Sequence, residues 1–143
     1  MKKYRLLLSI ICCSLILCDS LTLMAQRSDY KVVFDLTSRD SVDQKNLVRW
    51  LTEISSNNPD AKLEVVMYAK GLEMVVKGKS SVADEISRLS ANKNITFQVC
   101  AIAMKNNQIE PGQLLTGVGI VPDGIYEIMR KQKEGWGYIK AAR

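Results

Sequence analysis

Apolar and polar positions follow two different periods along this chain, and the changes of period divide it into short strands and helices. Runs rich in β-branched and aromatic residues predict five strands, over 30–36, 61–70, 94–101, 116–122 and 136–141. Apolar residues spaced three and four apart predict helices over 42–56, 80–92 and 123–135, and a short helix early in 102–115. The segment that follows Gly71 predicts only a helical turn or loop.

Several boundaries of these helices depend on single residues. Ser41 and Gln44 have the S-x-x-Q spacing of a capping box, which predicts that Ser41 caps the first helix. Pro122 suits the first turn of the last helix, and Gly135 is expected to end it. Strands that alternate with helices favour a parallel sheet covered by helices on both faces. We therefore expect one three-layer α/β domain with about five strands, flavodoxin-like in style.

The N-terminus has a pattern of its own. The basic stretch MKKYR precedes the apolar run LLLSIICCSLILC and the more polar DSLTLMAQ. This order is typical of a secretory signal peptide, so we expect cleavage after Ala25 and a mature domain over 26–143 in the periplasm or outside the cell. The apolar run is shorter than the roughly 20 residues that a membrane span needs. The alternative is an uncleaved anchor that would tether the domain to the membrane.

Loss of the signal peptide changes the cysteine count and the charge. Cys12, Cys13 and Cys18 would leave with it, and Cys100 would remain as a single thiol that cannot form an internal disulfide. The chain has no histidine, which excludes a Cys-His dyad, a Ser-His-Asp triad and the usual zinc sites. Three basic residues and one acidic residue would also leave, so the formal net charge falls from +5 to +3. The remaining lysines and arginines are dispersed, which argues against a nucleic-acid partner.

Cys100 falls at the carboxyl end of the third predicted strand, where catalytic groups and ligands collect in open parallel sheets. A helix that starts directly after Cys100 would favour its thiolate through free N–H groups and the positive end of the helix dipole. The alternative is that Cys100 is a small buried hydrophobic residue. Asp35, at the end of the first strand, is expected to be a loop or helix-cap residue rather than a carboxylate facing the same crevice.

Three motifs follow one another in the carboxyl half: Val99-Cys100-Ala101, the segment from Val118 to Ile125, and the closing EGWGYIK. The amino half adds KVVFDL and LEVVMYAKGLEMVVKG, two strands with a loop that starts at a glycine. Together these motifs resemble the DsrE/DsrF-like sulfur-relay family, and the resemblance covers nearly all of the mature chain. It implies a parallel α/β fold and a homo- or hetero-oligomer, often a trimer or hexamer. We expect a homo-oligomer that needs no cofactor and binds no metal.

The resemblance also implies that Cys100 carries sulfur as a persulfide and passes it to a partner protein. Ser38, Gly71 and Ala101 would border the same crevice as substrate-binding residues. We therefore expect a sulfur carrier or a sulfurtransferase-like protein, although the well-understood members are cytoplasmic and this chain has the pattern of an exported protein. Two alternatives stay open. One is a binding or oligomeric module with an inert Cys100, and the other is a thiol protein that reduces peroxides but lacks a resolving cysteine.

Overall fold

The computed structural model describes residues 30–141, so the predicted signal peptide at 1–25 and its three cysteines lie outside the described residues. Five parallel strands form one sheet in the order β4-β3-β2-β1-β5. Their bounds are β1 Lys31–Leu36, β2 Lys62–Met67, β3 Ile95–Cys100, β4 Val118–Val121 and β5 Gly137–Lys140. This confirms the predicted α/β class, the five strands and the parallel sheet.

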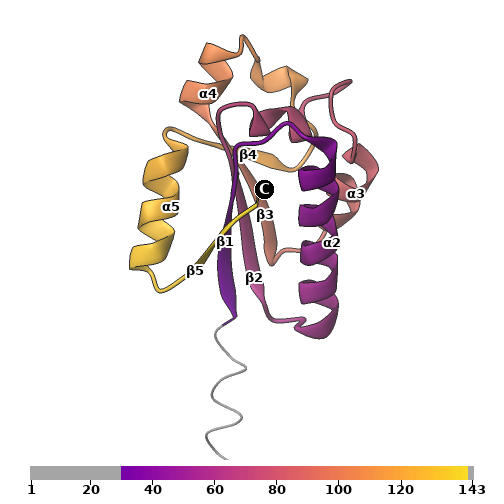
Figure 1. Cartoon of the computed structure of the whole chain (residues 1–143), viewed down its shortest axis with the longest axis vertical. Coiled ribbons are helices and arrows are strands. Elements are labelled where there is room, and N and C mark those ends of the chain that lie inside the picture. Colours follow the sequence, from indigo (N-terminus) through magenta and orange to yellow (C-terminus); the bar gives the residue numbers. More distant parts are fainter. Residues whose placement is uncertain (1–29, 142–143) are drawn as a thin grey trace, which may run out of the picture.

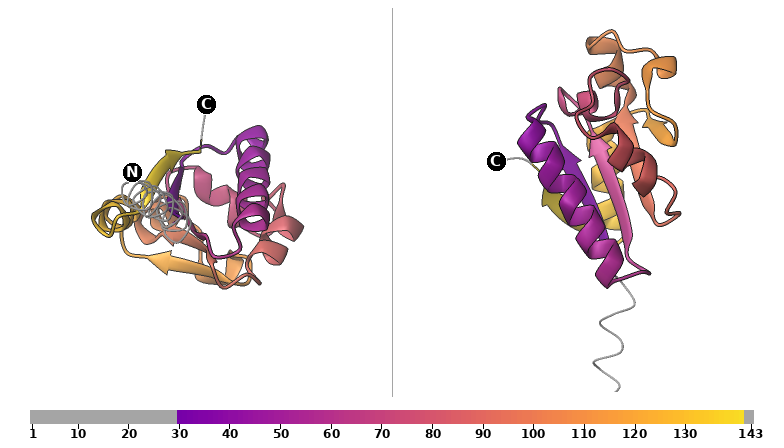
Figure 2. Two further views of the ribbon diagram at one scale, coloured as in Figure 1. Left: turned by 90° about the horizontal axis from the view of Figure 1, so that it is seen from below. Right: turned by 90° about the vertical axis from the view of Figure 1, so that its right-hand side faces the viewer.

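Helices cover both faces of this sheet (Figure 1). Their bounds are α2 Ser41–Asn57, α3 Ala83–Leu89, α4 Ala101–Asn106 and α5 Gly124–Lys133, with short 3-10 helices η1 Gly71–Val75 and η2 Pro111–Gln113. Helices α2 and α3 cover one face and α5 the other. In the right-hand view of Figure 2 the segment from α4 to η2 stands beyond the carboxyl ends of the strands. That segment is therefore placed where parallel sheets gather their functional groups.

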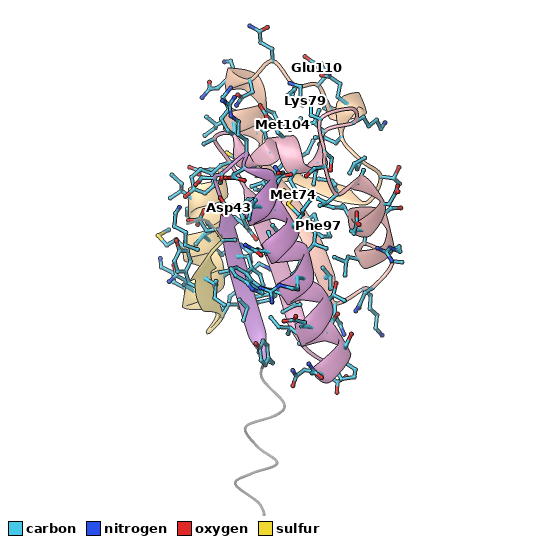
Figure 3. The ribbon with its side chains drawn as sticks, turned by 45° about the vertical axis from the view of Figure 1, so that its right-hand side comes forward. Asp43, Met74, Lys79, Phe97, Met104 and Glu110 are labelled. Carbon is cyan, nitrogen blue, oxygen red and sulfur yellow. The ribbon has the colours of Figure 1, made fainter. Side chains whose placement is uncertain are left out.

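The larger core lies between the sheet and α2 and α3. Alternate residues of the three central strands point to this side, and Leu47 and Leu51 of α2 are fully buried against them. Figure 3 looks towards this side of the sheet, with Met74 and Phe97 labelled beside α2. The ring of Phe34 stacks on that of Trp50, with ring centres 6.5 Å apart. The long runs of apolar residues in β1 to β3 are thus explained by burial on both faces.

The opposite face of the sheet has a smaller core. After β4 the chain crosses this face through α5 and returns as β5 at the other edge, next to β1. Val33 and Val66 pack here against Ile128 of α5, with Tyr68 and Trp136 partly buried beside them. Because a single helix covers five strands, polar side chains on this face have room to form the clusters described below.

Several predicted boundaries were wrong. The cap of α2 is Asp40, whose carboxylate accepts a hydrogen bond from the Val42 N–H (2.8 Å), and not Ser41. Gln44 is buried and accepts a hydrogen bond from the Ser81 hydroxyl (3.1 Å), so it serves tertiary packing rather than a capping box. Pro122 lies outside α5, because Asp123 is the cap and the helix begins at Gly124.

The other boundaries were closer to their predictions. Gly135 follows the end of α5 with a φ of +84°, a conformation that favours glycine, so this prediction is confirmed. Helix α3 covers only the middle of the predicted 80–92, and β2 ends at Met67 rather than at residue 70. The segment after Gly71 forms the 3-10 helix η1, in line with the predicted helical turn.

Candidate functional site

Cys100 is the last residue of β3 and the cap residue of α4, as the sequence predicts. Its backbone is still extended (φ −71°, ψ 121°), and the helix starts at Ala101. The thiol accepts no hydrogen bond from the first turn of α4, so the expected stabilisation by helix N–H groups is not formed in this arrangement. The residue is only 5% exposed.

The Cys100 side chain contributes to a pocket of about 310 Å³ at this edge of the sheet. The walls come from the segment after β2, from α4 and from the start of α5. The lining residues are Tyr68, Ala69, Cys100, Ile102, Ala103, Asn106, Asn107, Asp123 and Ile125. Ile102 and Ile125 are 52% and 64% exposed, so the pocket opens onto an apolar rim.

The start of α5 lies directly against the thiol residue. A Cβ atom on Gly124 would stand 3.1 Å from the Cβ of Cys100 and 3.2 Å from a methyl group of Val66. The absence of a side chain at this position lets α5 approach the sheet this closely. Gly124 therefore sets how near the rim residue Ile125 stands to Cys100.

Asn107 and Asp123, two polar residues of the pocket, are hydrogen-bonded within the fold. The Asn107 amide donates to the carbonyl oxygens of Ala103 (2.7 Å) and Ala69 (3.1 Å), and its own oxygen accepts from the Lys70 ammonium (2.8 Å). Asp123 accepts hydrogen bonds from two N–H groups of α5. The Cys100 thiol, in contrast, accepts no hydrogen bond from the first turn of α4, and it is the nucleophilic group that lines this pocket.

A buried carboxylate lies on the same sheet face, two strands from the thiol. Asp35 is in register with Val66, which is in register with Gln98, and it is 3% exposed. Its oxygen Oδ2 accepts from the hydroxyls of Tyr138 (2.8 Å) and Tyr68 (3.1 Å) and lies 3.4 Å from the ammonium of Lys140. The other oxygen, Oδ1, is buried without a hydrogen-bond partner among residues 30–141. The prediction that Asp35 is a loop or cap residue was wrong.

These contacts change the acidity of the two phenols. Burial and the Asp35 carboxylate raise the pKa of Tyr68 to about 12. The hydrogen bond to Asp35, with burial, also raises the pKa of Tyr138. Both hydroxyls therefore stay protonated at neutral pH and act as donors to Asp35.

A second charged cluster lies on this face at the opposite end of the strands. The Lys131 ammonium is 2.7 Å from Oε2 of the buried Glu64 and 4.3 Å from the centre of the Trp136 ring. Burial raises the pKa of Glu64, although Lys131 acts against the shift. For Glu127, burial is outweighed by the Arg130 hydrogen bond and neighbouring contacts, which lower its pKa. This cluster fastens α5 to β2 and stands apart from the thiol.

The other predicted site residues lie near the same edge but do not line the pocket. The Ser38 hydroxyl accepts from the Asp40 N–H (3.1 Å). Gly71 packs so closely on β1 that a Cβ would come 2.1 Å from the Leu36 carbonyl oxygen. Ala101 follows Cys100 as the first residue of α4. Their roles in substrate binding stay predictions.

Sequence reasoning missed Tyr68, Ile102 and Ile125 as lining residues. Tyr68 follows the carboxyl end of β2, the strand beside β3. Because the ends of parallel strands meet at one edge, this position was an available signal. Among residues 30–141 no group of three or more His, Cys, Asp or Glu side chains could hold a metal ion.

Comparisons with known proteins agree with this arrangement. The model of the DsrE/DsrF-like family matches residues 31–141. A protein of unknown function from Methanobacterium thermoautotrophicum has a similar structure, with a TM-score of 0.73, 28% identity, and coverage of 78% of this chain and 99% of that one. A search among curated proteins finds no match.

Two further solved structures share the fold at lower identity. A conserved protein of unknown function from Bacteroides thetaiotaomicron has a TM-score of 0.65 and 15% identity, covering 78% of this chain and 94% of its own. The ychN protein from E. coli has a TM-score of 0.63 and 12% identity, covering 77% of this chain and 96% of its own. At these identities the likeness shows the fold alone.

Proposed function

The chain belongs to the DsrE/DsrF-like family, and from this premise we propose that it has a sulfur-relay role in which Cys100 holds a sulfane sulfur as a persulfide. The observation that carries the proposal is the position of Cys100. It lies at the carboxyl end of a central parallel strand and is the one cysteine among the residues that line the pocket. The family membership suggests sulfur relay in general, and the thiol in this pocket supports the finer assignment.

The proposed chemistry needs one thiol and no cofactor. The Cys100 thiolate attacks a sulfane sulfur of a polysulfide or persulfide donor, a new S–S bond forms, and the donor leaves one sulfur shorter. An acceptor thiolate then attacks the outer sulfur of Cys100–S–SH. The S–S bond breaks, the acceptor keeps the sulfur as its own persulfide, and Cys100 is released as a thiol.

The 5% exposure of Cys100 favours one competing function. In that alternative the domain is a binding or oligomeric module, and Cys100 is an inert packing residue. Reactivity separates the two, because an inert thiol would gain no sulfur in the folded protein. The peroxide-reducing alternative is separated by comparing the rates at which peroxide and polysulfide consume the same thiol.

We also propose that the protein is exported and forms a homo-oligomer. Export rests on the sequence pattern of the N-terminus. None of the helices within residues 30–141 is long and apolar enough to cross a membrane. The outer face of α5 supports oligomerisation, because Ile125, Tyr126 and Met129 are large apolar residues between 40% and 64% exposed. Light scattering on the purified protein would measure the oligomeric state.

Cyanolysis tests the sulfur-carrier proposal. Cyanide removes the outer sulfur of a persulfide as thiocyanate and leaves the thiol. The chain from Gln26 to Arg143 should release thiocyanate after polysulfide loading and removal of excess reagent, and Cys100→Ser should release none. Equal release from both proteins, or none from either, would contradict the proposal.

A further inference from the structure

Tyr68 connects the Cys100 pocket to the buried carboxylate of Asp35. Its side chain lines the pocket, and its hydroxyl donates a hydrogen bond of 3.1 Å to Asp35 Oδ2. The backbone of Tyr68 is held as well, because its N–H donates to the Leu36 carbonyl at the end of β1. The ring is therefore fixed at both ends, at its Cα by the sheet and at its hydroxyl by Asp35.

The Cβ atom of Tyr68 lies near the Cβ atom of Cys100. The point where Gly124 would carry a Cβ lies 3.1 Å from the Cβ of Cys100 and 3.6 Å from the Cβ of Tyr68. The two side chains are thus neighbours beneath the first residue of α5. Because only 5% of Cys100 is exposed, small movements of this wall decide whether a reagent reaches the sulfur.

The position of Asp35, which holds the Tyr68 hydroxyl, costs the protein some stability. One of its oxygens serves the two tyrosine hydroxyls and Lys140, while the other is buried without a partner. A buried acceptor without a donor destabilises the folded state, because its hydration is lost and not replaced. An apolar residue would avoid that cost, but it would leave the Tyr68 hydroxyl without an acceptor and its ring free to turn.

We propose that Asp35 anchors Tyr68 as a shield over Cys100, so that sulfur held there is protected from small thiols in solution. The inference rests on the proposed sulfur-carrier function for its biological meaning. The anchoring itself is a property of the described residues. Tyr68 limits access to Cys100, and Asp35 is a positioning residue that acts by holding Tyr68 in place.

The reaction that the shield slows is discharge of the persulfide. A small thiolate attacks the outer sulfur of Cys100–S–SH, that S–S bond breaks, and Cys100 leaves as a thiol. The small thiol becomes a persulfide, so no oxidant or reductant is needed. A carrier exposed to such thiols would lose its sulfur before an acceptor protein binds.

Two tyrosines on the same carboxylate provide a matched test. Tyr68→Phe and Tyr138→Phe each remove one hydroxyl from Asp35 Oδ2, but only Tyr68 lines the Cys100 pocket. We would measure the rate of iodoacetamide alkylation of Cys100 in the folded full chain, on the tryptic peptide 94–105, and the rate of persulfide discharge by 2-mercaptoethanol. The urea midpoint of each variant monitors folding.

We expect both rates to rise about tenfold in Tyr68→Phe, because losing one hydrogen bond to a carboxylate shifts the balance between the anchored and the displaced ring by about that factor. Both rates should stay at the wild-type value in Tyr138→Phe. Asp35→Leu, which removes the acceptor, should behave like Tyr68→Phe. Asp35→Asn keeps an acceptor oxygen and should stay near wild type. This pair tests the anchor even if a tyrosine variant fails to fold.

Equal alkylation rates in wild type and Tyr68→Phe would overturn the inference, as would an equal rise in Tyr138→Phe. The alkylation arm does not depend on sulfur chemistry. A protein that takes up no sulfur but shows the tyrosine difference would refute the proposed function and support the shield. A protein that takes up sulfur but shows no difference between the tyrosine variants would support the proposed function and refute the shield.

Discussion

Gly124 at the start of α5 lies against Cys100, and a Cβ atom at Gly124 would stand 3.1 Å from the Cys100 Cβ. The loop and helix after β4 therefore contact the end of β3 through a position that has no side chain. This contact brings Ile125 to the rim of the pocket that Cys100 lines. The position of α5 and the access to Cys100 are thus coupled.

Gly124→Ala should lower the free energy of unfolding by about 1 kcal/mol, since overpacking a filled site costs about 1–3 kcal/mol and the gain in helix propensity offsets part of it. The added methyl group would meet Cys100 and the fully buried Val66, which have little room to move. Urea denaturation measures the change. Gly112→Ala is the control, because nothing lies within 4 Å of its added Cβ. Equal stability of the two variants would show that α5 is not packed as described.

Lys131→Met should destabilise the protein by about 3–5 kcal/mol, because it leaves the carboxylate of Glu64 buried without its cation. The ammonium and Oε2 of Glu64 are 2.7 Å apart, and the Lys131 side chain is 13% exposed. Arg49→Met is the matched control, since Arg49 and Glu53 are both more than half exposed. A surface pair of that kind contributes about 0–1 kcal/mol. Similar losses in the two variants would contradict the buried cluster.

Glu64 should make stability fall as the pH rises. Because burial raises its folded pKa above the ordinary 4.5, its contribution is complete below that pH and is lost as the pH rises through the folded pKa. Glu127, whose pKa is lowered, acts in the opposite direction and loses its contribution as the pH falls. Glu64→Gln should therefore flatten the dependence of unfolding free energy on pH above the ordinary carboxyl pKa of 4.5. Parallel profiles for wild type and variant would refute this assignment.

Tyr68 should titrate late and respond to Asp35. Its pKa is raised to about 12 by burial and by the Asp35 carboxylate. Asp35→Asn removes the charge and should lower that pKa, which ultraviolet absorbance of tyrosinate would record in a Tyr138→Phe background. The stability linked to Tyr68 should be lost as the pH rises above about 10, where the unfolded phenol ionises first. An unchanged titration in Asp35→Asn would contradict the influence of the Asp35 charge on Tyr68.

Local sequence patterns predicted the elements well where one rule governs them. Runs rich in β-branched and aromatic residues predicted the five strands, and Gly135 predicted the end of α5, because burial and backbone conformation dictate those residues. Ser41 was a wrong cap because Asp40, one residue earlier, caps the helix by accepting from the Val42 N–H. The pattern also could not show that Gln44 bonds to Ser81. Choices between neighbouring capping residues depend on tertiary contacts.

The site was predictable at its centre and less so at its walls. Cys100 could be placed from the end of a strand and the helix that follows, and both were confirmed. Asp35 was misassigned because its partners Tyr138 and Lys140 come from β5, more than a hundred residues later in the chain. Asp35 and these two residues come together because β5 pairs with β1 at the edge of the sheet. A local sequence pattern does not predict this pairing.

The most direct test of the account is the intact mass of the chain from Gln26 to Arg143 before and after incubation with polysulfide, beside Cys100→Ser. We expect a gain of about 32 Da, one sulfur atom, which a reductant removes and the serine variant lacks. No gain in the folded protein, with a thiol that is alkylated only after denaturation, would contradict it and show that Cys100 is a packing residue.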